Sequence, residues 1–267
     1  MQHLPVITIG FSPCPNDTFI FDALVNRKIE SPYQWEVHLA DVEELNRMAF
    51  ASTLTVTKLS FHTWLHLQNR YDLLESGSAL GVGCGPLLIA KKEIDLNNPA
   101  IRIAIPGEMT TANFLFKSCY PHLKNNTVPL LFSAIEEAVL NGTVDAGVII
   151  HENRFTYAAK GLHKIKDLGE WWETTTQAAI PLGGIVIKNT VAKAEQLVIS
   201  NCIKQSTAYA FAHLPELAEY VKSHAQEMDE AVMRQHIDLY VNDYTLELGT
   251  RGHAAIQTMQ DYFNRHR

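Results

Sequence analysis

The chain has 267 residues, of which 46% are hydrophobic and 19% charged, and its formal net charge is −7 at pH 7. This composition is typical of a globular protein with one large domain or two small ones. The negative charge and the lack of a Lys/Arg run argue against a nucleic-acid binder, but they still permit an anionic small-molecule ligand.

The amino-terminal residues 1–11 show neither a basic segment nor a long apolar stretch with a cleavage site, so we expect no signal peptide. No later stretch reaches the roughly 18 uninterrupted apolar residues of a membrane span. Four widely spaced cysteines without a CxxC pair indicate reduced thiols: Cys14, Cys84, Cys119 and Cys202. A cytoplasmic protein without a membrane span is therefore expected.

Five short apolar stretches are predicted to form strands, and a polar or turn-forming residue follows each of them. The stretches are residues 7–11, 35–39, 54–57, 101–105 and 146–150. In open α/β sheets, ligands bind outside the carboxyl ends of the strands. The polar residues that follow these strands therefore indicate a small-molecule site.

Strand and helix signals alternate over the first ninety residues. After the first strand, Asn16 and Asp17 can cap a helix over residues 18–25. After the second strand, Asp41 and Glu44 form a capping-box pattern before another helix. Such alternation predicts parallel strand pairing with right-handed crossovers.

Two apolar runs flanked by glycine, residues 86–90 and 181–187, enclose a βαβ-like unit. Because glycine suits strands that bend, we interpret the runs as crossing strands between two lobes. Residues 1–92 and 181–267 would form lobe one, with the helical carboxyl-terminal part packed on it, and residues 93–180 would form lobe two. This organisation predicts an α/β protein that closes on a ligand in the cleft between its lobes.

His151 directly follows the most apolar of the predicted strands. Imidazole is the side chain whose ordinary pKa lies closest to neutrality, so a histidine at the end of a strand can act as a general base. The alternative is a structural histidine that bonds a backbone carbonyl. Its position at the carboxyl end of a strand favours the functional interpretation.

Thr110 and Thr111 follow a Pro-Gly turn and open a predicted helix over residues 112–116. The backbone N–H groups and two hydroxyls of such a turn can hold an anion, which the helix dipole also favours. The alternative is an ordinary helix cap, a role that threonine often has. We expect this turn to bind an anionic group of a ligand.

The segment Lys58-Leu59-Ser60 ends the third predicted strand, and Lys58 and Ser60 share one face of it. A lysine in an apolar strand either needs a carboxylate partner or reaches solvent from a sheet edge. Ser12 and Asn16 lie in a loop that two prolines stiffen, and they can contact a ligand or merely cap a helix. All five residues are candidates for substrate binding.

Other signals are weaker. The run of residues 81–85 is rich in glycine but lacks the spacing of a nucleotide-binding loop. His62 and His66 are four residues apart without a third ligand, so no metal is expected. No cysteine-hydrolase signature surrounds Cys14, so it is not expected to be a nucleophile.

Several stretches together resemble one family, the 1,4-dihydroxy-6-naphthoate synthases of the futalosine route to menaquinone. SPCPND and HExRFTY are the specific motifs among them. In chain order the matching residues are 12–19 (SPCPNDTF), 41–46 (DVEELN), 58–60 (KLS), 77–87 (GSALGVGCGPL), 106–107 (PG), 110–112 (TTA), 151–157 (HENRFTY) and 181–184 (PLGG).

The resemblance implies a two-lobed, periplasmic-binding-protein-like (type II) α/β fold that serves as a cytoplasmic enzyme. It implies a carbon–carbon lyase that converts cyclic dehypoxanthine futalosine to 1,4-dihydroxy-6-naphthoate with loss of a three-carbon fragment. His151 would be the proton acceptor, and residues 58–60 with Thr110 and Thr111 would contact the small carboxylate substrate. No metal or other cofactor is implied.

Two other functions remain open at this point. Chorismate dehydratase resembles this family in fold and acts in the same pathway on a different substrate. A non-catalytic solute-binding protein would bind a ligand tightly without turnover, and it would normally carry a secretion signal. Assays with each substrate separate these functions.

Overall fold

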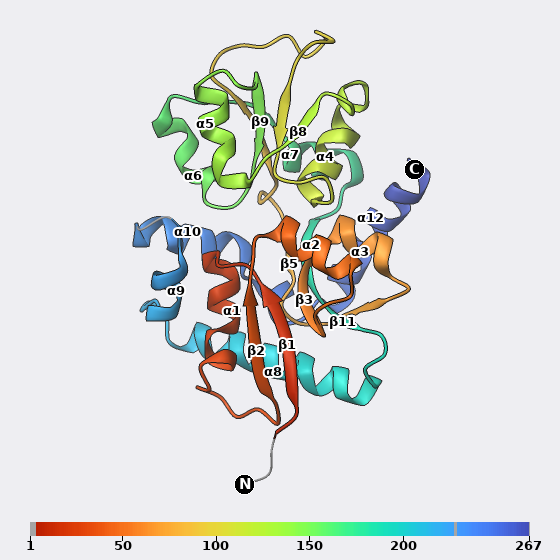
Figure 1. The fold of residues 1–267 in the computed structure, drawn as a ribbon, viewed down its shortest axis with the longest axis vertical. Helices are drawn as coiled ribbons and strands as arrows, with labels where there is room; N and C mark the ends of the chain where they lie inside the picture. Colours follow the sequence, from red (N-terminus) through yellow and green to blue (C-terminus); the bar gives the residue numbers. More distant parts are fainter. Residues whose placement is uncertain (1–3, 227–228, 267) are drawn as a thin grey trace. The chain divides into compact units, whose positions relative to one another are not determined.

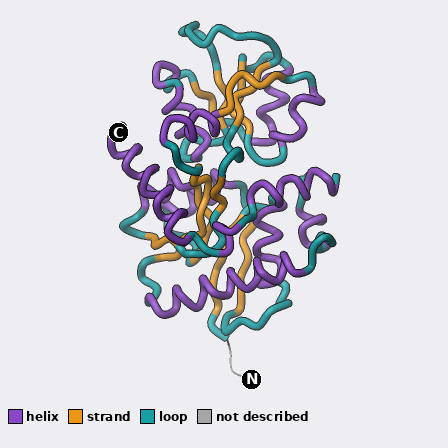
Figure 2. Tube along the Cα trace, turned by 180° about the vertical axis from the view of Figure 1, so that it is seen from behind, coloured by secondary structure: helices purple, strands orange, loops and turns teal. Residues whose placement is uncertain are grey.

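The structure, a computed structural model, describes residues 4–226 and 229–266, and it divides into two compact units. Unit 1 comprises Met1–Gly81 and Pro181–Arg267, and unit 2 comprises Val82–Ile180. Each unit has a sheet of its own with helices packed beside it (Figures 1 and 2). Unit 1 is therefore built from both ends of the chain.

The sheet of unit 1 has a parallel core, as the alternation of strands and helices predicted. β1 pairs in parallel with both β2 and β3, whereas β11 joins β3 in antiparallel orientation. In the described residues the strand order is β2-β1-β3-β11-β4, and β5 pairs with β11. The strands are β1 (Val6–Phe11), β2 (Gln34–Leu39), β3 (Val56–Ser60), β4 (Tyr71–Leu73), β5 (Ala79–Gly81) and β11 (Ile180–Lys188).

The carboxyl-terminal helices α8, α9 and α10 pack against the first helix, α1, so that distant parts of the sequence share one core. Figure 1 shows α8 running across the strands β1 and β2. Buried residues from both ends of the chain meet in this core, including Ile9, Phe21, Ile185, Ile203 and Ile237. The helices of unit 1 are α1 (Pro15–Val25), α2 (Val42–Phe50), α3 (Phe61–Leu67), α8 (Lys193–Ala212), α9 (Glu219–His224), α10 (Glu230–Tyr240), α11 (Asp243–Leu246) and α12 (Gly249–Arg265).

The sheet of unit 2 mixes both orientations. β7 pairs in parallel with β8 and β9, and β6 pairs in antiparallel orientation with β9 and β10. The strands are β6 (Leu87–Ala90), β7 (Ile103–Ile105), β8 (Thr127–Pro129), β9 (Ala146–Ile149) and β10 (His163–Asp167). The helices are α4 (Thr111–Cys119), α5 (Ile135–Leu140), α6 (Asn153–Thr156) and α7 (Leu168–Thr176), with short 3₁₀ turns at Pro121–Leu123, Phe132–Ala134 and Tyr157–Lys160.

The first boundary between the units differs from the expected one at residue 92. β6 lies between β9 and β10 in the unit 2 sheet, and a strand belongs with the strands that satisfy its backbone hydrogen bonds. Residues 82–92 therefore fall in unit 2 and not in lobe one. The other glycine-flanked run, residues 181–187, lies within β11 in the unit 1 sheet.

All five stretches that were predicted as strands form strands, namely β1, β2, β3, β7 and β9. β3 begins at Val56 and ends at Ser60, so the segment Lys58-Leu59-Ser60 ends this strand as expected. The helix expected over residues 18–25 begins earlier, at Pro15. No helix in the described part of the chain combines the length and apolar character needed to cross a membrane.

Candidate active site

The carboxyl ends of β1 and β3 lie next to each other in the unit 1 sheet. Ile9 is opposite Val56 and Gly10 is opposite Thr57 in this parallel pair. Continuing the register brings Ser12, just after β1, to the same edge as Ser60 at the end of β3. This edge corresponds to the position where open α/β sheets bind ligands.

Asp17 connects the residues at this edge. Its Oδ2 accepts hydrogen bonds from the backbone N (3.1 Å) and the Oγ (2.7 Å) of Ser12. Its Oδ1 accepts from Asn16 Nδ2 at 2.8 Å and from Lys58 Nζ at 2.7 Å. These four bonds occupy the acceptor positions of a carboxylate. Asp17, only 1% exposed, therefore joins the loop after β1 to β3.

This arrangement corrects the expectation that Asn16 and Asp17 cap the first helix. The residue at the start of α1 is Cys14, and no side chain caps the helix there. Both side chains are instead committed to the network around the Asp17 carboxylate. Asp17 bonds Ser12 and Asn16 nearby and Lys58, which is 41 residues away, so its role is not that of a helix cap.

Lys58 is buried, with its side chain 6% exposed, and its ammonium forms an ion pair with Asp17. The carbonyl oxygen of Gly77 lies 3.5 Å from the same nitrogen. The lysine therefore does not reach solvent, and the protein itself supplies the carboxylate that a buried amine needs. Gly183 leaves room for it, since a Cβ there would lie 3.1 Å from Lys58 Cε and 3.0 Å from the Leu59 oxygen.

Ser60 is held by Asn46, a fully buried residue of α2. Asn46 Oδ1 accepts from the backbone N of Ser60 at 3.0 Å, and Asn46 Nδ2 donates to Ser60 Oγ at 3.2 Å. Sequence reasoning missed Asn46, although a polar residue among the apolar positions of an amphipathic helix was the available signal. Leu59 packs into an apolar cluster with Tyr71 and Val186, so only its backbone remains a candidate for ligand contact.

In unit 2, Thr110 caps α4. Its Oγ1 accepts from the backbone N of Asn113 at 3.2 Å and donates to the Gly107 oxygen at 2.9 Å. The helix-cap alternative is therefore what the structure shows for the Thr110 hydroxyl. Thr111 is the first residue of the helix and is 3% exposed. The cap takes up the backbone N–H of Asn113, and the positive end of the helix dipole at this turn still favours an anionic group.

His151 follows β9 after Ile150 and adopts the left-handed conformation, with φ of 56°. For a non-glycine residue this conformation costs about 1–3 kcal/mol, and such strain is concentrated at functional sites. The Phe132 ring packs edge-on against the imidazole, with 5.0 Å between ring centroids. His151 thus lies shortly after the end of an apolar strand, and its half-buried imidazole packs on one side against the Phe132 ring.

The residues after His151 anchor its turn. Asn153 Nδ2 donates to Glu136 Oε2 on α5 at 2.5 Å, and Lys160 pairs with the same oxygen at 2.7 Å. The Arg154 guanidinium donates to the carbonyl oxygens of Gly83 and Gly85 and to Asp167. Asn153 and Arg154 therefore hold the turn in place beside His151, which is the motif's candidate base.

Other chemistry finds little support among the described residues. Within residues 4–226 and 229–266, no group of three or more His, Cys, Asp or Glu side chains could hold a metal ion. His62 and His66 contact each other, with 3.4 Å between their Nε2 atoms. Burial raises the pKa of the Cys84 thiol to about 12, so this cysteine is a poor nucleophile at neutral pH.

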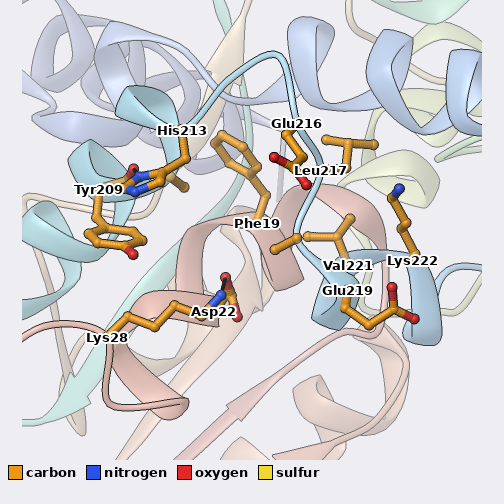
Figure 3. Close-up of a pocket in the computed structure, with 12 residues that line it drawn as sticks. Phe19, Asp22, Lys28, Tyr209, His213, Glu216, Leu217, Glu219, Val221 and Lys222 are labelled. Carbon is orange, nitrogen blue, oxygen red and sulfur yellow. Dashed lines mark hydrogen bonds and ion pairs between the residues drawn. The ribbon is translucent and has the colours of Figure 1, made fainter.

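A cavity of about 250 Å³ lies elsewhere in unit 1, among α1, the end of α8 and α9 (Figure 3). Its lining contains none of the predicted site residues. The buried Asp22 carboxylate on its wall is already paired with Lys28 at 2.6 Å and bonded by Asn26. This cavity is separate from the candidate site.

Comparison with known proteins identifies related sequences along nearly the whole chain. A family model described as menaquinone biosynthesis matches residues 7–265. A curated Thermus thermophilus protein named 1,4-dihydroxy-6-naphtoate synthase is 42% identical over 255 residues, which cover 95% of this chain and 92% of that protein.

Solved structures show the same fold. A protein of Archaeoglobus fulgidus has a TM-score of 0.91 at 32% identity, over 99% of this chain and 98% of the other. The alkanesulfonate-binding protein of Xanthomonas axonopodis, solved with MOPS bound, has a TM-score of 0.70 at 14% identity, over 99% and 94% of the two chains. The expected periplasmic-binding-protein-like fold is confirmed.

Proposed function

The chain belongs to the menaquinone biosynthesis family, and from this premise we propose that it converts cyclic dehypoxanthine futalosine to 1,4-dihydroxy-6-naphthoate. The reaction is a carbon–carbon cleavage that releases a three-carbon fragment. A relative with this product in its name, 42% identical over 95% of the chain, supports the proposal. We propose that the enzyme acts in the cytoplasm, which cell fractionation would check.

His151 is the proposed general base. A neutral imidazole can remove the proton that starts ring opening, and formation of the aromatic naphthalene then favours cleavage. The observation that carries this role is the left-handed turn of His151 at the end of an apolar strand. The edge-on Phe132 ring and the bonds of Asn153 and Arg154 limit the positions that the imidazole can take.

The other candidates are proposed to bind different parts of the same substrate. The Thr110/Thr111 turn would meet the aromatic carboxylate, chiefly through backbone N–H groups and Thr111, since the Thr110 hydroxyl already donates to Gly107. Lys58 and Ser60, with Ser12 and Asn16, would meet the oxygens derived from the ribose. The protein then supplies orientation, a base and exclusion of water.

The test is incubation of the purified protein with cyclic dehypoxanthine futalosine and mass detection of the naphthoate. We expect product from this substrate and no loss of water from chorismate. Dehydration of chorismate would identify a chorismate dehydratase instead. Tight binding of the substrate without turnover would identify a solute-binding protein.

A further inference from the structure

The hydroxyl of Ser12 has its proton committed within the protein. Ser12 Oγ lies 2.7 Å from Asp17 Oδ2. A carboxylate can only accept, so the hydroxyl donates and its lone pairs remain for another partner. Asn16 shares Asp17 with Ser12, and its own Oδ1 is buried without a hydrogen-bond partner among the described residues. This side of the network therefore presents acceptors.

The hydroxyl of Ser60 is held in the opposite sense. Because Asn46 Oδ1 accepts from the backbone N of Ser60, the amide nitrogen must face Ser60 Oγ. Asn46 Nδ2 also lies 3.4 Å from Glu43 Oε2, which agrees with this orientation of the amide. An amide nitrogen only donates, so Ser60 Oγ accepts this bond and keeps its own proton available.

We propose that Asp17 and Asn46 are positioning residues that give the two binding serines opposite hydrogen-bond polarity. Ser60 then donates to an acceptor oxygen of the ligand, and Ser12 accepts from a ligand hydroxyl. Lys58 shares the strand face of Ser60 and adds a second donor there. The site thus selects a ligand part that carries a carbonyl or carboxylate oxygen and a hydroxyl. The inference rests on the proposed function, through the substrate used in its test.

Asn46→Asp tests this polarity, because it keeps the size of the side chain but replaces the donor by an acceptor. The Ser60 hydroxyl then donates to the new carboxylate and turns a lone pair toward the ligand. We expect kcat/KM to fall on the order of 100-fold, against about 10-fold for Ser60→Ala. When Ser60→Ala is already present, adding Asn46→Asp should lower kcat/KM by less than about a further 3-fold, because the hydroxyl that the new carboxylate would reorient has been removed.

Ser206→Ala is the matched control. Ser206 is fully buried, donates to the Ile20 oxygen at 2.6 Å and accepts from the Leu24 N at 3.0 Å, so its loss affects stability. It should leave kcat/KM unchanged. Thermal unfolding of every variant separates loss of fold from loss of activity.

Asn46→Ala serves if Asn46→Asp does not fold. It removes the hydrogen bond to Ser60 but leaves the serine hydroxyl able to donate. Ser60→Ala should therefore still lower kcat/KM by about 10-fold in the Asn46→Ala background. The inference is overturned if Asn46→Asp leaves kcat/KM unchanged, or if it lowers kcat/KM by the same factor with and without Ser60→Ala. It is also overturned if Ser60→Ala leaves kcat/KM unchanged in the Asn46→Ala background. A wild-type protein without turnover refutes the proposed function and this inference with it, whereas active wild type with these variant results refutes the inference alone.

Discussion

In unit 1 two buried side chains, Asp17 and Asn46, hold the polar candidate residues, whereas in unit 2 the candidate base lies in a strained turn that its neighbours anchor. Asp17 alone receives four hydrogen bonds, three of them from the side chains of Ser12, Asn16 and Lys58. The His151 imidazole, by contrast, is half-buried and packs against Phe132.

The difference matches the two tasks that we propose. A site binds its ligand more tightly when its donors and acceptors are already fixed, because less conformational entropy is then lost on binding. A base must both receive a proton and release it, which a half-buried imidazole at the surface of its unit can do. Substitutions in the buried network of unit 1 should therefore reduce stability, whereas substitutions in the turns of unit 2 should mainly reduce binding or turnover.

The largest expected effect on stability is that of Asp17→Asn. The substitution preserves shape but leaves the buried Lys58 ammonium without its counter-charge, which typically costs about 3–5 kcal/mol. Denaturant unfolding should show this loss of unfolding free energy. The double variant Asp17→Asn/Lys58→Met should recover much of it, because an apolar side chain does not need the carboxylate. A loss below about 1 kcal/mol for Asp17→Asn would mean that the ion pair does not hold unit 1 together.

Gly183→Ala should have a smaller effect on the same network. The added Cβ would lie 3.0 Å from the Leu59 oxygen and 3.1 Å from Lys58 Cε, so strand or side chain must shift by a few tenths of an ångström. We expect a loss of about 1–2 kcal/mol in unfolding free energy together with a raised KM. A variant with wild-type stability and KM would show that Lys58 has more room than the contacts imply.

Thr111→Val should act mainly on binding. The valine keeps the shape of threonine but removes one hydroxyl from the proposed anion turn, so KM should rise more than kcat falls, by about 1–2 kcal/mol in apparent binding. Thr207→Val is the control, because Thr207 is fully buried in α8 and its hydroxyl donates to the Ile203 oxygen and not to the proposed site. Unchanged steady-state kinetics for Thr111→Val would remove this residue from the site.

The sequence predicted those elements that have a strong apolar pattern. β3 and β9 are buried along their whole length and β1 along most of it, and the carboxyl-terminal helices repeat apolar residues at three- and four-residue spacing. β10, with the sequence HKIKD, lacks such a pattern, and its strand structure depends on pairing with β6. Because β6 and β10 are far apart in the chain, neither this pairing nor the boundary near residue 82 could be read locally.

The positions of Ser60, at the end of β3, and of His151, shortly after β9, were predictable from the strand pattern, whereas their roles stay predictions. The partners that orient these residues were not predictable in the same way. Asp17 looks like a helix cap in its local context, and only its contact with Lys58, 41 residues away, shows its place in the network. Asn46 holds Ser60 from another element, 14 residues away, so local pattern does not reveal it.

His151 is proposed to perform the chemistry, while other residues bind the substrate. The most direct measurement determines substrate affinity and naphthoate formation on the same preparation of His151→Ala, with His163→Ala as control because His163 is exposed in β10. We expect near wild-type affinity with kcat reduced about 10²–10⁴-fold for His151→Ala, and full activity for the control. If His151→Ala keeps more than a few tenths of wild-type kcat, His151 is not the base.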